Sequence, residues 1–328
     1  MTTLAIIGGG IAGRSLIYAL AKKKKNFSKI TLFDSESFAP ACSLRSTAIV
    51  ANRGVTSGHS ALGDLLFAGH KTFSQHVQSD SPSGVFSIKQ YTAGTKNIDL
   101  FKLRYPNWNS SSSFGELELN SKMTMASEDA FLIDPSLYLD WLLNRSQELN
   151  LDIRREFVTG VQKSTKGIEV TDQIKNMYHF DKVIFCGGSS NRFWDSTFTG
   201  RPIHGSYFEF SNIDLKGESF SLTLDSDNLI YHAHSKKLLL GSTSQDNGLM
   251  LVSHSELNNI HERLQRQLAF ELPSLDSSPL IITGLREKAA KRAPYLAEKG
   301  HCLWMGGLYK NGFSLSLHLS QQLIERFL

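Results

Sequence analysis

Three glycines near the N-terminus have the spacing of a phosphate-binding turn. Gly8, Gly10 and Gly13 match the pattern G-x-G-x-x-G, and they follow a short apolar run over residues 4–7 that predicts a strand. The first glycine permits a tight turn, the second lets the backbone approach a pyrophosphate, and the third lets the next helix pack on the strand. Free N–H groups and the dipole at the start of that helix favour negative charge. We therefore predict that this turn binds a dinucleotide.

Asp34 stands where a ribose-binding carboxylate is expected. It follows a second apolar strand, residues 29–33, and comes about twenty residues after Gly13. A carboxylate there accepts hydrogen bonds from ribose hydroxyls and repels a 2′-phosphate, which disfavours NADP and allows NAD or the adenosine half of FAD. A glycine turn that binds nothing is the alternative, and the order strand, turn, helix, strand, acid counts against it.

The elements around these residues predict an α/β fold. Apolar runs over 182–185 and 302–305, each followed by glycines, predict further strands of one Rossmann-like sheet. Residues 205–242 alternate apolar and polar side chains, which predicts a second domain built on an antiparallel or mixed β-sheet. We assign residues 1–80, 126–200 and 285–328 to the nucleotide-binding domain, and residues 81–125 and 201–284 to the second domain, which we expect to bind the substrate.

Several local patterns predict secondary structure outside that sheet. Asp134 and Pro135 predict the capped start of a helix that runs to about residue 149. Residues 256–272 have apolar positions at helical spacing, and Pro273 closes the run. Residues 100–103 read as a strand, and the serine-rich segment 109–113 reads as a loop tip.

The composition excludes several classes of protein. The chain has 328 residues, of which 41% are hydrophobic and 20% charged, as in ordinary globular proteins. A net charge of +4 is too small to imply nucleic-acid binding without a localised basic face. Three widely separated cysteines offer neither a disulfide framework nor a CxxC metal site, so we expect no metal and a reducing compartment. With no apolar run of about 18 residues and no secretory signal, we expect a cytoplasmic protein without a membrane span.

Together the motifs resemble the D-amino-acid oxidase and glycine oxidase family of FAD-dependent enzymes over almost the whole chain. Residues 133–135 (IDP) resemble the family's (V/I)DP segment, and residues 186–189 resemble its A-G-A-W turn beneath the cofactor. Residues 229–243 resemble its YxxPR…GAT hairpin, whose tyrosine lies over the substrate. Residues 284–286 (GLR) resemble GLRP, whose arginine pairs with a substrate carboxylate. Residues 307–313 resemble the GHFRNGI turn, which places backbone N–H groups at the N1/C2=O edge of the flavin.

The resemblance implies the residues of two sites. Arg286 would bind the substrate carboxylate, Tyr231 would cover the substrate, and Lys310 would lie beside both substrate and flavin. Val158 would use its backbone N–H and C=O against the adenine. The residues that would bind FAD non-covalently are Gly8, Gly10, Ile11, Ala12, Gly13, Asp34, Ser35, Ser43, Arg45, Ser46, Val158, Cys186, Gly187, Gly307, Lys310, Asn311, Gly312 and Phe313.

The chain also departs from the family pattern. Glu287 follows Arg286 where the family has proline, Lys310 replaces a second substrate-side arginine of glycine oxidase, and His234 replaces the arginine of the tyrosine hairpin. Arg286 could instead be one of several surface cations, and Tyr231 could be a core aromatic. Cys302 raises the alternative of a covalent flavin, as in sarcosine oxidases, but its apolar surroundings favour a buried thiol.

Three functions follow from the resemblance. The leading hypothesis is an oxidase or dehydrogenase that takes hydride from the carbon beside the amine of a small amino acid or secondary amine to flavin N5. Residues 42–66 also resemble the FAD domain of the bifunctional tRNA wobble-uridine modification enzyme, so a tRNA side-chain oxidase is the second. An FAD-binding homologue without turnover is the third. Salt-sensitive tRNA binding would distinguish the second from the others.

Overall fold

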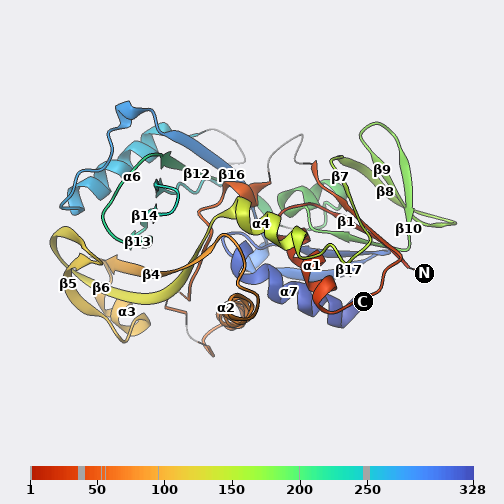
Figure 1. Ribbon diagram of the computed structural model, residues 1–328, viewed down its shortest axis with the longest axis horizontal. Coiled ribbons are helices and arrows are strands. Elements are labelled where there is room, and N and C mark those ends of the chain that lie inside the picture. The colour runs from red at the N-terminus through yellow and green to blue at the C-terminus, as the bar shows by residue number, and fades with distance from the viewer. Residues whose placement is uncertain are drawn as a thin grey trace.

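The computed structural model describes residues 2–35, 41–52, 54–55, 57–94, 96–198, 200–246 and 252–328. Figure 1 shows two lobes, with both chain termini in the lobe that contains β1 and α7. Each lobe is organised around a large sheet, and strand β16 runs from one lobe toward the other (Figure 1). Within the described ranges, no helix is both long and apolar enough to cross a membrane.

The first sheet has six strands and contains the glycine turn. In pairing order its strands are β17 (Tyr295–Lys299), β18 (Cys302–Gly306), β11 (Lys182–Phe185), β1 (Thr3–Ile7), β2 (Lys29–Phe33) and β7 (Leu151–Arg154). All neighbours are parallel except the edge strand β17. The strand β1 is buried on both faces, which explains why its sequence is a continuous apolar run rather than an alternating one. This confirms the predicted α/β, Rossmann-like fold.

Both faces of the six-stranded sheet are covered. Leu4 and Ile6 of β1 pack in one core with helices, whereas Ala5 and Ile7 pack in a second core with a small sheet. The helices of the first core are α1 (Ile11–Lys22), α2 (Ala61–Asp80), α4 (Pro135–Asn144) and α7 (Gly312–Phe327). The small sheet on the other face consists of β8 (Val158–Ser164), β9 (Gly167–Asp172) and β10 (Met177–Phe180).

The second sheet has nine strands and is mixed. In pairing order they are β16 (Leu280–Lys288), β12 (Arg201–Phe210), β15 (Lys237–Gly241), β14 (Asp227–His232), β13 (Phe220–Leu224), β4 (Val85–Gly94), β6 (Leu117–Ile133) and β3 (Ile49–Val50), with β5 (Asn109–Phe114) beside β6. Only β13 and β4 pair in parallel among these neighbours. Helix α6 (His254–Gln267) packs its Leu257, Ile260 and Leu264 on one face. An antiparallel or mixed second sheet is thereby confirmed, whereas the exact domain limits stay a prediction.

Short helices connect these elements. They are η2 (Cys42–Arg45), α3 (Ile98–Arg104), η3 (Gly188–Ser190), α5 (Asn191–Trp194), η4 (Leu275–Ser277) and η5 (Ala290–Arg292). Two of them matter for the site, because η2 follows the glycine turn's partner strand β2 and η3 follows β11. Both therefore lie beyond the carboxyl ends of parallel strands, where ligands of open α/β sheets bind.

Four local predictions were wrong. Helix α4 ends at Asn144 rather than near residue 149, since the chain turns at Arg145, where Ser146 N donates to the Leu143 carbonyl oxygen. Residues 100–103 belong to helix α3 rather than a strand, and Phe101 packs on Tyr105 one turn later, because a short apolar run does not distinguish the two. The serine-rich segment forms strand β5, which is held by pairing with β6 and by burial of Phe114. Helix α6 ends at Gln267 rather than 272, since Leu268 leaves the helix to pair with Leu119.

Candidate active site

A cavity of about 510 Å³ lies at the carboxyl ends of the parallel strands and is lined by residues of both lobes. Its walls come from the glycine turn, the η2 loop, the start of β8, the turn after β11, strands β12, β14 and β16, and the turn before α7. The predicted cofactor residues that line it are Gly8, Gly10, Ile11, Ala12, Asp34, Ser35, Ser43, Arg45, Ser46, Val158, Cys186, Gly187, Lys310, Asn311, Gly312 and Phe313. The structure thus brings segments from both ends of the chain into one site.

The glycine turn has the geometry of a phosphate cradle. Gly8 has a φ of +113°, and a Cβ there would lie 2.6 Å from the carbonyl oxygen of Cys186. At Gly10 a Cβ would lie 3.1 Å from Ser43 Oγ, which accepts a hydrogen bond from Ile11 N at 2.9 Å. Gly13 lies behind the turn, where a Cβ would overlap the Gly8 carbonyl oxygen. The cradle therefore fits a pyrophosphate, with Gly8 and Gly10 at its surface and Gly13 as the packing glycine.

Arg14 positions Asp34, a role that the sequence did not reveal. Its guanidinium donates from Nε to the Gly9 carbonyl oxygen at 2.7 Å and from Nη2 to Asp34 Oδ2 at 3.3 Å. A third contact joins Nη1 to Asp140 at 3.1 Å. Both Arg14 and Asp34 are buried, so the ion pair is little screened by solvent. The arginine thereby ties the carboxylate to the glycine turn.

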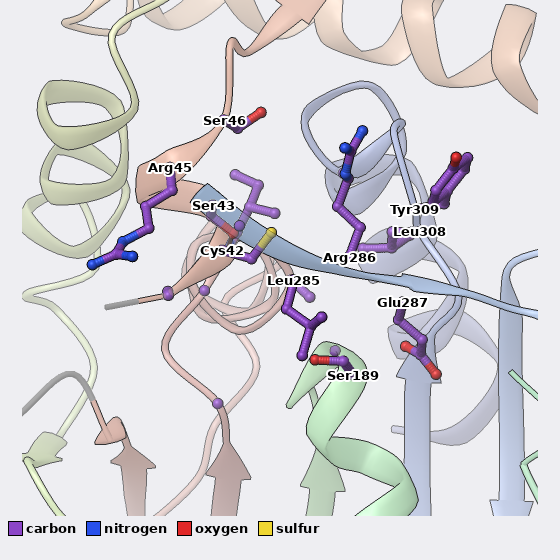
Figure 2. A pocket seen from close by; sticks show the side chains of 18 of the residues that line it. Cys42, Ser43, Arg45, Ser46, Ser189, Leu285, Arg286, Glu287, Leu308 and Tyr309 are labelled. Carbon is purple, nitrogen blue, oxygen red and sulfur yellow. Dashed lines mark hydrogen bonds between the residues drawn. The ribbon is translucent and has the colours of Figure 1, made fainter. Parts of the chain in front are cut away.

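The η2 loop forms the wall beside the glycine turn. Ser43 and Ser46 line the cavity, and Ser46 Oγ accepts a hydrogen bond from Ala48 N at 3.1 Å. Arg45 donates from Nη1 to the Thr283 carbonyl oxygen at 3.2 Å, and its side chain points away from Arg286 (Figure 2). This contact links the loop to β16.

Another wall of the cavity contains Val158, which was predicted to contact the adenine, and the turn after β11. The Val158 carbonyl oxygen accepts a hydrogen bond from Trp194 Nε1 at 3.3 Å, and Gly187 N donates to Asn191 Oδ1 at 2.9 Å. Burial raises the pKa of the Cys186 thiol well above its usual range, so this cysteine is a neutral packing residue. Trp194 and Asn191 were not among the predicted site residues.

The turn between β18 and α7 is held by Glu287. Gly307 N donates to Glu287 Oε2 at 2.8 Å, and Tyr309 N donates to the Glu287 carbonyl oxygen at 2.9 Å. Gly307 is not among the residues that line the cavity, although Gly306 and Leu308 on either side of it are, and its contact with the cofactor stays a prediction. Residues 308–313 do line it, and α7 begins there at Gly312 with N–H groups that a helix start leaves free for a ligand.

Glu287 is a buried carboxylate at the rim of this turn. Besides Gly307, it accepts a hydrogen bond from the Tyr295 hydroxyl at 2.7 Å, and only 4% of the residue is exposed. Burial raises the pKa of Glu287, and the Gly307 and Tyr295 hydrogen bonds oppose that rise only in part. The sequence showed Glu287 only as a departure from the family's proline.

Removing the Glu287 carboxylate is expected to destabilise the turn. Glu287→Ala should lower the free energy of unfolding by about 2–4 kcal/mol, because the Gly307 N–H and the Tyr295 hydroxyl lose their buried acceptor. Glu287→Gln keeps one amide oxygen as an acceptor, so it should lower the free energy of unfolding by less. Since the folded-state pKa is raised, the contribution of Glu287 to stability is full at low pH and falls as the pH rises above 4.5. In urea unfolding, the free energy of unfolding of wild type should fall toward that of Glu287→Gln as the pH rises. Equal stability of the Ala and Gln variants would contradict the role of Glu287 as a hydrogen-bond acceptor.

Arg286 reaches the cavity from β16. Its Nη2 donates to the Thr243 carbonyl oxygen at 3.1 Å, and a Cβ at Gly205 on the neighbouring strand would overlap this nitrogen. The guanidinium carbon lies 5.7 Å from the centre of the Tyr309 ring. Figure 2 shows Arg286 and Tyr309 on one side of β16 and Glu287 on the other. Gly205 therefore provides the space in which the guanidinium lies.

Tyr231 does not reach the cavity, so its predicted position over the substrate was wrong. Only 1% of the residue is exposed, its ring packs on Phe220, and its hydroxyl lies 3.4 Å from the Ile213 carbonyl oxygen. Asn228 and Ile230 of the same strand line the cavity instead. Because side chains alternate along a strand, a shift by one residue exchanges the two faces.

The remaining residues of interest lie outside the cavity lining. His234 stacks on Phe86 at 4.0 Å and lies 3.8 Å from Asp134. Cys302 begins β18 beside Val183 and Lys299, and burial raises the pKa of its thiol to about 11. Cys302 is half-buried and is not among the residues that line the cavity, which favours a structural thiol over a covalent flavin link. Two cysteines do line the cavity, Cys42 and Cys186.

Comparison with protein families assigns the chain. A family model described as "FAD dependent oxidoreductase", the DAO family, matches residues 3–326. The chain therefore belongs to the DAO family of FAD-dependent oxidoreductases, and its cofactor is FAD. A search of curated proteins finds no match.

Solved structures share this fold across the whole chain. Glycine oxidase from Geobacillus kaustophilus has a TM-score of 0.79 at 16% identity, covering 99% of this chain and 94% of that one. Iminodiacetate oxidase from Chelativorans sp. BNC1 has a TM-score of 0.77 at 14% identity, with coverages of 98% and 95%. L-α-glycerophosphate oxidase from Mycoplasma pneumoniae, with FAD bound, has a TM-score of 0.80 at 14% identity, with coverages of 99% and 94%. At these identities the likeness establishes the fold and leaves the substrate open.

Proposed function

We propose that the protein oxidises the C–N bond of a small amino acid or secondary amine. The observation that carries this proposal is the position of Arg286, whose guanidinium lies in the same cavity as the glycine turn and the turn before α7. FAD held by the glycine turn and the turn before α7 would supply the acceptor for a hydride from the substrate carbon. The substrate nitrogen would release a proton, and water would hydrolyse the imine product. The glycine oxidase and iminodiacetate oxidase folds are in keeping with this class of substrate.

Arg286 would bind and orient the substrate carboxylate. A guanidinium can donate two parallel hydrogen bonds to a carboxylate, which fixes the direction of the neighbouring C–H bond. The hydrogen bond to the Thr243 carbonyl oxygen and the space above Gly205 hold the guanidinium in one place before substrate binds. Such preorganisation lowers the entropic cost of reaching the reactive geometry.

The turn over residues 310–312 would stabilise negative charge on the reduced cofactor. Lys310, Asn311 and Gly312 all line the cavity, and the helix α7 begins at Gly312. Backbone N–H dipoles and one lysine charge fixed at this position favour an anionic ring without reorganisation during the reaction. The contacts of Glu287 keep the turn in place.

Flavin absorbance tests the proposed function directly. The purified protein, supplied with FAD, is expected to show a visible flavin spectrum that bleaches anaerobically with at least one amine among amino acids of both hands and secondary amines. Absence of any flavin band after addition of FAD would contradict the cofactor site. A stable band that no amine bleaches would favour the alternative of an FAD-binding homologue without amine turnover. The assay thereby separates binding from chemistry.

A further inference from the structure

One face of the second sheet borders the cavity and continues beyond it. Ile230 and Tyr207 line the cavity, and they pack in one core with Ile88 and Leu239 of nearby strands. Gln90 is two residues after Ile88 on β4, so its side chain lies on the same face. Strands β4, β13 and β14, which carry this part of the face, are in the lobe away from both termini (Figure 1). The cavity wall therefore continues across the sheet toward Gln90.

Gln90 and Ser221 are buried on this face without hydrogen-bond partners. Ser221 on β13 is level with Gln90 on β4 and with Ile230 on β14 in the strand register. Both polar residues are 0% exposed, and neither the Ser221 hydroxyl nor either polar atom of the Gln90 amide has a partner among the described residues. Because an unpaired buried polar atom costs stability, such atoms usually contact a water, an ion or a ligand.

Asn228 brings the same polar character to the cavity wall. It is two residues before Ile230 on β14 and lines the cavity. Thr223 Oγ1 donates to Asn228 Oδ1 at 2.9 Å, which fixes the orientation of the carboxamide. The only hydrogen bond of this side chain to a described residue is through Oδ1, so the amide nitrogen keeps its N–H donors for a ligand.

Asn228 and Arg286 lie over the same face of the second sheet. Arg286 Nη2 lies above Gly205 of β12. Tyr207, two residues further along β12, is level with Gly241 and Asn228 in the strand register. At the usual strand spacings the α-carbons of Gly205 and Asn228 are roughly 12 Å apart. Since both polar side chains extend over this face, one small molecule with a carboxylate and a second polar group can contact both.

A carboxamide matches the polar side chains on this face. The Asn228 nitrogen can donate to a carbonyl oxygen, and the Ser221 hydroxyl and the Gln90 oxygen can accept hydrogen bonds. None of these three side chains is charged, so a carboxylate placed beside them would lose its hydration without gaining a cation. An alkyl group would leave the Asn228 donors unpaired.

We propose that the amine substrate bears a carboxamide, whose carbonyl oxygen accepts a hydrogen bond from Asn228 Nδ2 and whose N–H group donates toward Ser221 and Gln90. This inference rests on the proposed amine oxidation and specifies its substrate class. Asn228 would contact the group directly. Ser221 and Gln90 lie one and two strands beyond Ile230, and would bind the group through a water that also satisfies their own polar atoms. All three are specificity-determining residues.

Isosteric pairs of amines test the inference. Asparagine and leucine, each in both hands, differ by a carboxamide against an isopropyl group, and N-carbamoylmethylglycine and N-isobutylglycine differ in the same way on nitrogen. In stopped-flow flavin reduction, kcat/KM of the carboxamide is expected to exceed that of its alkyl partner by at least about tenfold, because the alkyl group leaves buried donors unpaired. Aspartate should react more slowly than asparagine, since its second carboxylate finds no cation there.

Substitutions on this face should reduce the ratio of carboxamide to alkyl kcat/KM. Asn228→Leu keeps the size of the side chain but removes the N–H donors, so the ratio should fall by about tenfold while the alkyl partners react as before. Ser221→Ala and Gln90→Met should lower the ratio by a smaller factor. Ser146→Ala is the matched control, because Ser146 is equally buried but its hydroxyl donates to the Leu142 carbonyl oxygen at 2.8 Å, away from the cavity lining. It should leave the ratio unchanged.

The outcomes separate this inference from the proposed function. If no amine reduces the flavin, the proposed function itself fails. If only smaller amines such as glycine or sarcosine react, if the alkyl amines react as well as their carboxamide partners, or if Asn228→Leu leaves the ratio unchanged, the carboxamide site is overturned while amine oxidation stands. A lower melting temperature of Ser221→Ala and Gln90→Met with an unchanged ratio would overturn their part in binding and assign them a structural water.

Discussion

Arg286→Lys is expected to reduce kcat/KM for the amine substrate by about 100-fold or more while FAD remains bound. A lysine keeps the positive charge but cannot donate two parallel hydrogen bonds, so the carboxylate is held at one point and the C–H bond loses its fixed direction. A displacement of about 1 Å at the reacting atoms costs a factor of this size. Stopped-flow reduction of the flavin, with the flavin spectrum as a measure of cofactor content, checks the result.

Gly205→Ala should also reduce kcat/KM, by displacing the guanidinium of Arg286. A Cβ at this position would overlap Arg286 Nη2, so the guanidinium must move although its charge is kept. Gly160→Ala is the matched control, because its Cβ would meet Thr171 at an ordinary contact distance of 3.7 Å. We expect Gly205→Ala to raise KM with FAD content unchanged and Gly160→Ala to behave as wild type. Wild-type kinetics in both Arg286→Lys and Gly205→Ala would show that Arg286 does not bind the substrate.

Local motifs predicted many of the residues that line the cavity. The glycine spacing and Asp34 are determined by a single strand–turn–helix–strand unit, so residues close in sequence are also close in space. Arg286 was found because the GLR segment lies on one strand that reaches the cavity. The predictions for these residues needed no knowledge of how distant segments pack.

Of the residues that were missed, Arg14 joins Asp34 to Gly9 within one local unit, whereas the others act between separate elements. Glu287 holds the turn at Gly307, and Gly205 makes room for Arg286 from another strand. Such pairs depend on strand register and on the meeting of the two sheets, which hydrophobic patterns do not encode. The predicted position of Tyr231 was wrong for a related reason. The resemblance identified the hairpin but not which side chains of the strand face the cavity, and a shift of one residue changes the face.

Gly13→Ala is expected to abolish FAD binding and to lower the stability of the apoprotein. Alanine favours a helix over glycine by about 1 kcal/mol, but a Cβ at this position would overlap the backbone oxygen of Gly8. Backbone cannot rotate away as a side chain can, so α1 must shift from β1 at a cost of about 1–3 kcal/mol or more, which exceeds the gain in helix propensity. The melting temperature of apoprotein and its titration with FAD measure the two effects.

Gly10→Ala separates the phosphate cradle from the packing beneath it. Its Cβ would meet the Ser43 hydroxyl at 3.1 Å and the Ala41 Cβ at an ordinary contact distance of 3.9 Å. Because the hydroxyl can rotate, the apoprotein should keep its melting temperature. The same Cβ would project into the cavity where the pyrophosphate is bound, so FAD affinity should fall by about tenfold or more. Gly13→Ala would thus lose both FAD affinity and apoprotein stability, whereas Gly10→Ala would lose only FAD affinity. The reason is that Gly13 supports the turn from behind while Gly10 forms its surface. Equal melting temperatures for the two apoprotein variants would show that α1 tolerates the methyl group and that the third glycine has no packing role.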